Sequence, residues 1–230
     1  MIHKFKCDLL VSMSYNQIFG RSYQKFFSRK IINCHAGSLP FYRGRNILNW
    51  ALINGEKKFG ITVHFVDKGI DTGDIIIQKK YKISKLDDYK SLLNKCYKEC
   101  PKLVLISIDK FRLRNYKAIK QNDIDKKGSY FKKRKIGDEM INWSQNSNKI
   151  YNFVRALVDP GPFAQTFYKN RRIFIHKLEI LKKYSFKKSK SGTIVDLGRN
   201  KSLVVKTNDG FVLIKKYYPK INFKKMGMFK

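Results

Sequence analysis

Acidic residues and cysteines are scarce in this chain of 230 residues, and each shortage limits what it can be. It carries 17 Asp and Glu against 50 Lys and Arg, a formal net charge of +33 that attracts anionic ligands. None of its four cysteines forms a Cys-x-x-Cys pair, and Cys96 and Cys100 have no His beside them. We therefore expect reduced, buried thiols and no metal site.

Long hydrophobic runs and repeats are also missing. The longest apolar runs, such as residues 103–106, fall far short of the ~18 residues of a membrane span. The first twenty residues lack the apolar segment and cleavage site of a signal peptide, so we expect a soluble, cytoplasmic protein. A composition of 43% hydrophobic and 14% aromatic residues excludes a disordered chain, and this length can bury a sizeable core.

The cations are mainly lysine, with 39 Lys and 11 Arg. Surfaces that read phosphates or bases tend to use Arg, whose guanidinium binds in a bidentate fork. A lysine excess spread along the whole chain therefore favours a compositional bias of the source over a dedicated nucleic-acid surface, which stays the alternative. The charge by itself supports a phosphorylated substrate only weakly.

The order of the expected elements is typical of an α/β fold. An apolar strand at residues 8–14 is followed by a helical stretch, a second strand at 30–35 and a Gly- and Pro-rich loop. A helix at 46–54 and two strands at 59–66 and 75–83 come next. Residues 86–113 are expected to form one helix, or two with the break at Pro101.

The second half divides differently. Residues 114–139 are polar and lysine-rich and resemble a linker anchored by Tyr130 and Phe131, and helical spacing follows at 142–158. Alternating apolar runs from Phe163 onward predict a small β module. The expected organisation is a catalytic domain at 1–113, a linker and helix at 114–162, and a C-terminal β domain at 163–230.

The segment Asn33-Cys34-His35 carries the first chemical signal. In a strand, Asn33 and His35 share one face while Cys34 points to the other, since side chains alternate. This alternation offers two polar groups to one site and argues against a Cys34–His35 nucleophile pair. On this segment alone, a packed structural histidine is the more common outcome.

The surrounding pattern resembles the signature of the folate-dependent formyltransferases. This family has Asn-x-His, then a loop like Ser-Leu-Leu-Pro with Tyr-Arg-Gly, then Gly-Val-Thr or Gly-Ile-Thr, then Asp-x-Gly-x-Ile. The chain supplies Asn33 and His35, residues 38–44, residues 60–62 and residues 71–75, and the match runs loosely from residue 7 to about 215. Residues 43–46, 50–55 and 155–162 are most similar to enzymes that N-formylate nucleotide-linked amino sugars. A tRNA formyltransferase usually has a longer chain and Trp-Pro-Gly at the last of these turns.

The resemblance implies a catalytic set of Asn33, His35 and Asp71. The Asn33 amide would donate to the oxyanion formed when an amine attacks the formyl group of N10-formyltetrahydrofolate. His35 would take the amine proton, and Asp71 would hold the imidazolium. A turn-capping role is the alternative for Asp71. Asp74 is the other candidate for the carboxylate, but the spacing favours Asp71.

Binding residues are also implied by the resemblance. The folate pocket would involve Asn16, Gln17 and Ile18, for which an ordinary loop is the alternative. His64 is given a substrate-side or a structural role, and Arg43 either binds phosphate or braces its loop through an ion pair. The nucleotide-sugar side would be formed by Tyr42, Arg43, Arg45, Asn46, Trp50 and His64.

The resemblance further implies a partial Rossmann-like parallel-sheet domain, because family members have about 60 more residues before the segment that begins at Cys7. We expect the exposed edge of a parallel sheet to weaken the isolated chain or its folate binding. The family suggests a homodimer that makes a polysaccharide precursor. Two alternative functions stay open, a methionyl-tRNA formyltransferase and a non-catalytic basic protein on this scaffold.

Overall fold

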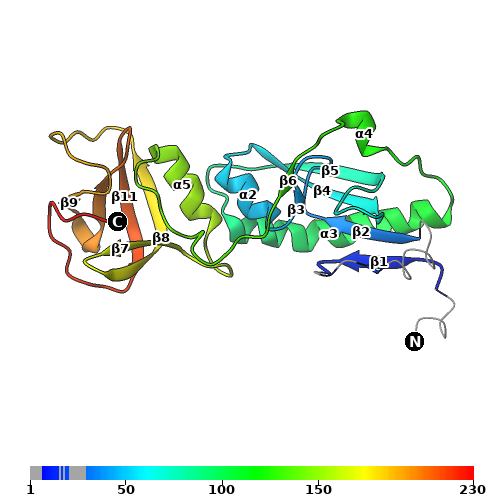
Figure 1. Cartoon of the computed structure of the whole chain (residues 1–230), viewed down its shortest axis with the longest axis horizontal. Coiled ribbons are helices and arrows are strands. Elements are labelled where there is room, and N and C mark those ends of the chain that lie inside the picture. The colour runs from blue at the N-terminus through cyan, green and yellow to red at the C-terminus, as the bar shows by residue number, and fades with distance from the viewer. Residues whose placement is uncertain (1–6, 16, 18, 21–29) are drawn as a thin grey trace. The chain divides into compact units, whose positions relative to one another are not determined.

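The computed structural model describes residues 7–15, 17, 19–20 and 30–230 (Figure 1). The chain divides into two compact units. The first unit comprises Met1–Ala51, Lys57–Ser84 and Leu92–Lys133, and the second comprises Leu52–Glu56, Lys85–Ser91 and Arg134–Lys230. Each unit has its own sheet, so each is described by itself.

The first unit is built on a sheet of four described strands in the order β1-β2-β4-β5. Strand β1 (Leu10–Met13) runs parallel to β2 (Ile31–His35), while β4 (Lys58–Phe65) is antiparallel to both β2 and β5 (Ile75–Lys82). Seven of the eight β4 residues are buried, as expected for a strand covered on both faces. The expected α/β class is confirmed, and within this four-stranded sheet β1–β2 is the one parallel pair among the described strands.

Helix α3 (Tyr89–Arg112) is a single helix with Pro101 inside it. The break considered at Pro101 does not occur. Proline removes one backbone N–H from the helix, but Pro101 and Tyr97, one turn earlier, lie on the exposed side. Water can therefore hydrogen-bond the carbonyl that loses its partner. The opposite side of α3 buries Leu92, Cys96, Cys100 and Leu103, and Figure 1 shows the helix running along the sheet.

The polar segment after α3 is tied to the first unit at several points. Ile119 exchanges backbone hydrogen bonds of 2.8 and 2.9 Å with Ile75 at the start of β5. The short helix α4 (Gln121–Ile124) follows, and β6 (Tyr130–Phe131) pairs in parallel with β3 (Arg43–Gly44). Helix α2 (Ile47–Ile53) begins shortly after β3. These contacts bring residues 119–131 to the loop that follows β2.

The second unit is a five-stranded antiparallel sheet in the order β7-β8-β11-β10-β9, with helix α5 (Ser147–Ala156) packed on β8. Its apolar core combines Ile150 and Val154 of α5 with Trp143 and the strand residues. Asn146 is the N-cap of this helix, and its side chain accepts from the Lys149 N–H at 2.8 Å. The strands are β7 (Ala164–Tyr168), β8 (Arg171–Leu181), β9 (Ile194–Leu197), β10 (Leu203–Lys206) and β11 (Phe211–Tyr218), with η2 (Arg199–Lys201) before β10.

Two features are absent from the residues that the structure describes. None of the helices there combines the length and the apolar character needed to cross a membrane. Within the same part of the chain, no group of three or more His, Cys, Asp or Glu side chains is arranged to hold a metal ion.

Gly73 sets how closely the loop before β5 can approach β4. A Cβ at Gly73 would lie 1.8 Å from the Phe65 carbonyl oxygen, which is backbone and cannot move aside easily. We predict that Gly73→Ala lowers the free energy of unfolding by about 1–3 kcal/mol, as overpacking typically does. Gly161→Ala is the control, because its nearest new contact is 3.2 Å away. Chemical denaturation of both variants measures this, and equal losses would contradict the role assigned to Gly73.

Candidate active site

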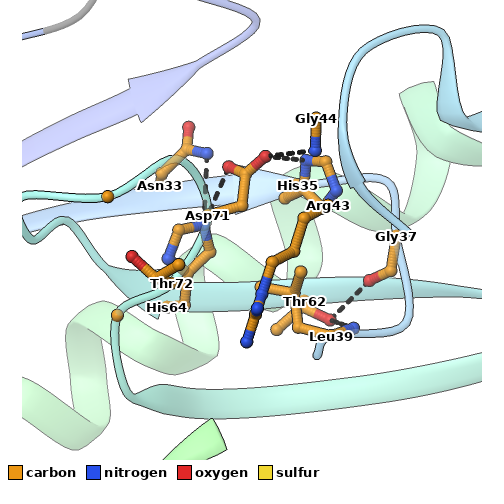
Figure 2. A network of polar contacts seen from close by, with 12 residues as sticks. Asn33, His35, Gly37, Leu39, Arg43, Gly44, Thr62, His64, Asp71 and Thr72 are labelled. Atoms are coloured by element: carbon orange, nitrogen blue, oxygen red, sulfur yellow. Dashed lines mark hydrogen bonds and ion pairs between the residues drawn. The ribbon is translucent and has the colours of Figure 1, made fainter. Parts of the chain in front are cut away.

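The site is built on the end of β2, where alternation separates its three side chains. Asn33 and His35 face a common polar network with Asp71 and His64 (Figure 2). Cys34 points the other way, toward α3, where hydrogen bonding to Cys100 and burial raise the pKa of its thiol. Because side chains alternate along β2, the polar face with Asn33 and His35 is separated from the packed face with Cys34.

His35 is held by the backbone that follows it. Its Nε2 lies 2.7 Å from the carbonyl oxygen of Tyr42, so this nitrogen carries a hydrogen and donates. Its Nδ1 lies 3.5 Å from Asp71 Oδ2. The neutral ring therefore keeps its lone pair on Nδ1, and a proton added there would face a carboxylate. Burial lowers the pKa of His35 below its usual 6.5, although the charge of Asp71 opposes this effect.

Asp71 is a mostly buried carboxylate between two imidazoles, with 12% of its side chain exposed. Its Oδ2 accepts from the Gly44 N–H at 2.9 Å, and its Oδ1 lies 3.5 Å from His64 Nε2. Burial would raise the pKa of Asp71, but His64, His35 and the Gly44 N–H together outweigh it and lower the pKa to about 2. Asp71 is therefore ionised throughout the neutral range.

Asn33 is oriented by His64, which is 2% exposed. His64 Nδ1 lies 2.7 Å from the Phe65 carbonyl oxygen and donates to it. In the neutral ring His64 Nε2 can then accept from the Asn33 amide, whose Nδ2 is 3.3 Å away. The amide has a second N–H hydrogen, so its position and donor direction are fixed while one donor is left for another acceptor.

The loop after His35 is fixed by Thr62 of β4. The Thr62 hydroxyl donates to the Gly37 carbonyl at 2.6 Å and accepts from Gln78 Nε2 at 2.9 Å. Gln78 also donates to the Leu39 carbonyl at 2.8 Å. Gly37 needs to lack a side chain, because a Cβ there would lie 2.4 Å from both His35 Nε2 and the Tyr42 oxygen. The His35–Tyr42 hydrogen bond depends on this close approach.

The residues assigned to the substrate side gather around β3 and β6. The ring of Tyr42 stacks on Phe131 with centroids 4.7 Å apart, and Trp50 lies 5.6 Å from the same ring. Arg43 directs Nε and Nη2 to the Gln121 side-chain oxygen at 3.0 and 2.8 Å. The partner that braces Arg43 is thus an amide and not a carboxylate. Arg45 and Asn46 follow on the same loop.

The expected folate residues lie after β1. Gln17 is exposed, and its side-chain oxygen accepts from the Tyr15 hydroxyl at 3.0 Å. Asn16 and Ile18 lie outside the described residues.

Sequence reasoning missed Gln121 and Gln78. Gln121 falls in the polar segment expected to be a linker, and it is 2% exposed in the structure. No local signal distinguishes it from the other polar residues of that segment. Gln78 is one polar residue of the strand β5, and nothing in the local pattern marks it out. Both act through backbone carbonyls, which a sequence pattern does not reveal.

The arrangement can support proton transfer next to a hydrogen-bond donor. His35 Nδ1 can accept a proton, Asp71 can stabilise the charge that results, and the Asn33 amide can donate to a developing negative oxygen. These are the requirements of acyl transfer to an amine.

Comparison with known proteins assigns both parts of the chain. Residues 1–107 match the formyl transferase family, and residues 134–226 match the formyl transferase C-terminal domain. The chain is similar to the bifunctional polymyxin resistance protein ArnA of Wigglesworthia glossinidia brevipalpis, with 38% identity over 200 residues. That match covers 85% of this chain and 29% of ArnA, so the chain spans less than a third of that relative.

Two further relatives differ in what they act on. The methionyl-tRNA formyltransferase of Clostridium beijerinckii is 32% identical over 220 residues, covering 94% of this chain and 68% of that enzyme. The structure of an N-formyltransferase from Helicobacter canadensis, solved with folinic acid and dTDP-3-aminofucose, is 26% identical with a TM-score of 0.70. It covers 90% of this chain and 73% of that one.

The His35–Asp71 contact predicts a measurable titration. We expect His35 to titrate below pH 6.5, and Asp71→Asn to lower its pKa further, because the variant loses the carboxylate charge that favours the imidazolium. NMR of the ring protons measures both values, with His176 on β8 as the internal control. An unchanged or raised His35 pKa in Asp71→Asn would contradict the contact.

Proposed function

The chain belongs to the formyl transferase family, and we propose that it transfers a formyl group from N10-formyltetrahydrofolate to the amine of a nucleotide-linked amino sugar. The observation that carries the chemistry is the meeting of Asn33, His35 and Asp71 in one partly buried polar network. The sugar acceptor is supported by the Helicobacter canadensis enzyme, whose structure was solved with dTDP-3-aminofucose. That structure matches this chain with a TM-score of 0.70.

Each of the three residues has one step in this reaction. His35 Nδ1 takes the proton that the amine loses as its nitrogen bonds to the formyl carbon. Asn33 donates its second amide N–H to the oxygen that becomes negative, a contact type worth about 3–4 kcal/mol in other enzymes. Asp71, ionised because its pKa is about 2, stabilises the His35 imidazolium until the proton passes to the folate nitrogen as its bond to carbon breaks.

The binding roles follow the same proposal. Gln17, with Asn16 and Ile18, belongs to the folate side. His64 orients Asn33 and borders the acceptor amine. The exposed part of the aromatic group of Tyr42 and Trp50, together with Arg45 and Asn46, suits the nucleotide sugar, and a guanidinium such as that of Arg45 or Arg43 suits its phosphates.

A methionyl-tRNA formyltransferase is the second candidate. It is favoured by the 32% identity to the Clostridium beijerinckii enzyme over 94% of this chain, and by a net charge of +33 that suits a polyanionic acceptor. In both candidates the nucleophile is a primary amine and the same three residues act. The candidates differ in the acceptor alone.

Three further features complete the proposal. The protein acts in the cytoplasm, forms a homodimer, and supplies a formylated sugar for polysaccharide synthesis. The competing class is a basic protein that keeps the scaffold and binds nucleic acid without catalysis. A protein that has lost catalysis has no chemical need to keep the Asn33 amide, the His35 imidazole and the Asp71 carboxylate together. Their presence favours an enzyme.

An acceptor assay separates these functions. Purified protein is given N10-formyltetrahydrofolate with dTDP- or UDP-linked amino sugars, and separately with methionyl initiator tRNA, and the products are analysed by mass spectrometry. We expect a mass gain of one formyl group on an amino sugar. Formylation of the tRNA alone would support the second candidate, and nucleic-acid binding without any formylation would support the non-catalytic protein.

His35→Ala tests the proposed base. We expect turnover to fall by at least about 100-fold, the lower range for a positioned general base, while the thermal transition stays cooperative. His176→Ala on β8 is the control and should keep wild-type turnover. Activity of His35→Ala near the wild-type level would remove His35 from the mechanism.

A further inference from the structure

Asp71 adopts a backbone conformation that it would not keep without support. Its φ is +55°, in the left-handed region, which costs a non-glycine residue about 1 kcal/mol or more. This conformation turns the carboxylate toward His35 and His64. Contacts outside the turn have to compensate for the strain if the carboxylate is to stay in place.

The compensating contacts come from Gln121. Its side-chain Nε2 donates to two carbonyl oxygens of the same turn, those of Asp71 and Gly73, each at 2.8 Å. The side chain is buried, with 2% exposed, so water does not compete for these hydrogen bonds. Both N–H hydrogens of the Gln121 amide thus donate to backbone carbonyls of the turn that carries the Asp71 carboxylate.

Arg43 fixes which way the Gln121 amide points. The guanidinium has only donors, and its Nε and Nη2 both reach the amide oxygen, at 3.0 and 2.8 Å. The oxygen of Gln121 must therefore face Arg43, and the NH2 group must face the turn. Gly44, which follows Arg43 in β3, donates its N–H to Asp71 Oδ2 at 2.9 Å. The short strand β3 therefore orients both the Gln121 amide and the Asp71 carboxylate.

The backbone around Gln121 is anchored independently. Ile119 forms two hydrogen bonds with Ile75, two residues beyond Gly73. The segment that carries Gln121 is therefore hydrogen-bonded to the chain just after the Asp71 turn. The Gln121 amide adds hydrogen bonds to the turn itself.

From this network we infer that Gln121 is a positioning residue for catalysis, which holds the Asp71 carboxylate against His35 by bonding the two carbonyls of its turn. The inference rests on the proposed function only in naming the reaction that benefits. Gln121 does not touch the reacting atoms. Its contribution is the distance between the carboxylate and the imidazole.

A double-mutant cycle measures that contribution without any activity assay. Asp71→Asn changes the pKa of His35, and the size of this change reports the His35–Asp71 coupling. His35 is also faced by His64 of β4, the Tyr42 carbonyl and Cys100 of α3, and these are the same in every member of the cycle. We expect the change to fall to less than half its wild-type size in a Gln121→Met background, as read by NMR titration.

Two variants separate bracing from bulk packing. Gln121→Met keeps the side-chain length and removes all four hydrogen bonds, whereas Gln121→Glu keeps the acceptor for Arg43 and cannot donate to the two carbonyls. Both should show the reduced coupling, and the formylation assay should show kcat/KM lower by about 100-fold, as for a catalytic group displaced by about 1 Å. Tyr81→Phe, which loses a hydrogen bond to Glu99 elsewhere in the first unit, is the control and should keep both values.

The outcomes are distinguishable. Full His35–Asp71 coupling in both Gln121 variants, even with lowered thermal stability, would overturn the inference and leave Gln121 a structural residue. Reduced coupling in a protein that formylates no acceptor would support the positioning role and overturn the proposed reaction instead. If Gln121→Met does not fold, the isosteric Gln121→Glu decides between the two.

Discussion

The site depends on one ionised carboxylate that is held in a mostly buried position. Asp71 lies between the imidazoles of His35 and His64 and accepts the Gly44 N–H, and these contacts lower its pKa to about 2 in spite of burial. A buried charge is costly unless it is paired and hydrogen-bonded. Every element near it, from the left-handed turn at Asp71 to the short β3–β6 pair, can be understood as meeting that requirement.

The same network gives each polar group one defined direction. The carbonyls of Tyr42 and Phe65 each take one N–H of a histidine, so the remaining nitrogens are left to face Asp71 and Asn33. Gly37 and Gly73 allow backbone to approach where a methyl group would collide with it. Catalysis by such a set relies on donors and acceptors that are already oriented before the substrate binds.

The two units of the chain differ in how they are made. The second unit is an ordinary antiparallel sheet whose core joins Trp143, α5 and the strands. The first places its polar groups at the end of β2 and in the loops that follow, where hydrogen bonds to the backbone hold them. The large positive charge resides mainly in lysines, and it attracts anionic ligands in general.

By itself, the sequence determined the α/β class, the approximate strands and the opposite faces of Asn33 and Cys34, because alternation along a strand is a local property. It also pointed to His35 and Asp71 through motif and spacing. Only the tertiary structure decided that Pro101 lies within one continuous helix, that Arg43 is bound by an amide, and that Gln121 braces the Asp71 turn. Those outcomes depend on solvent exposure and on hydrogen bonds to backbone carbonyls distant in the chain, which no local pattern of residues encodes.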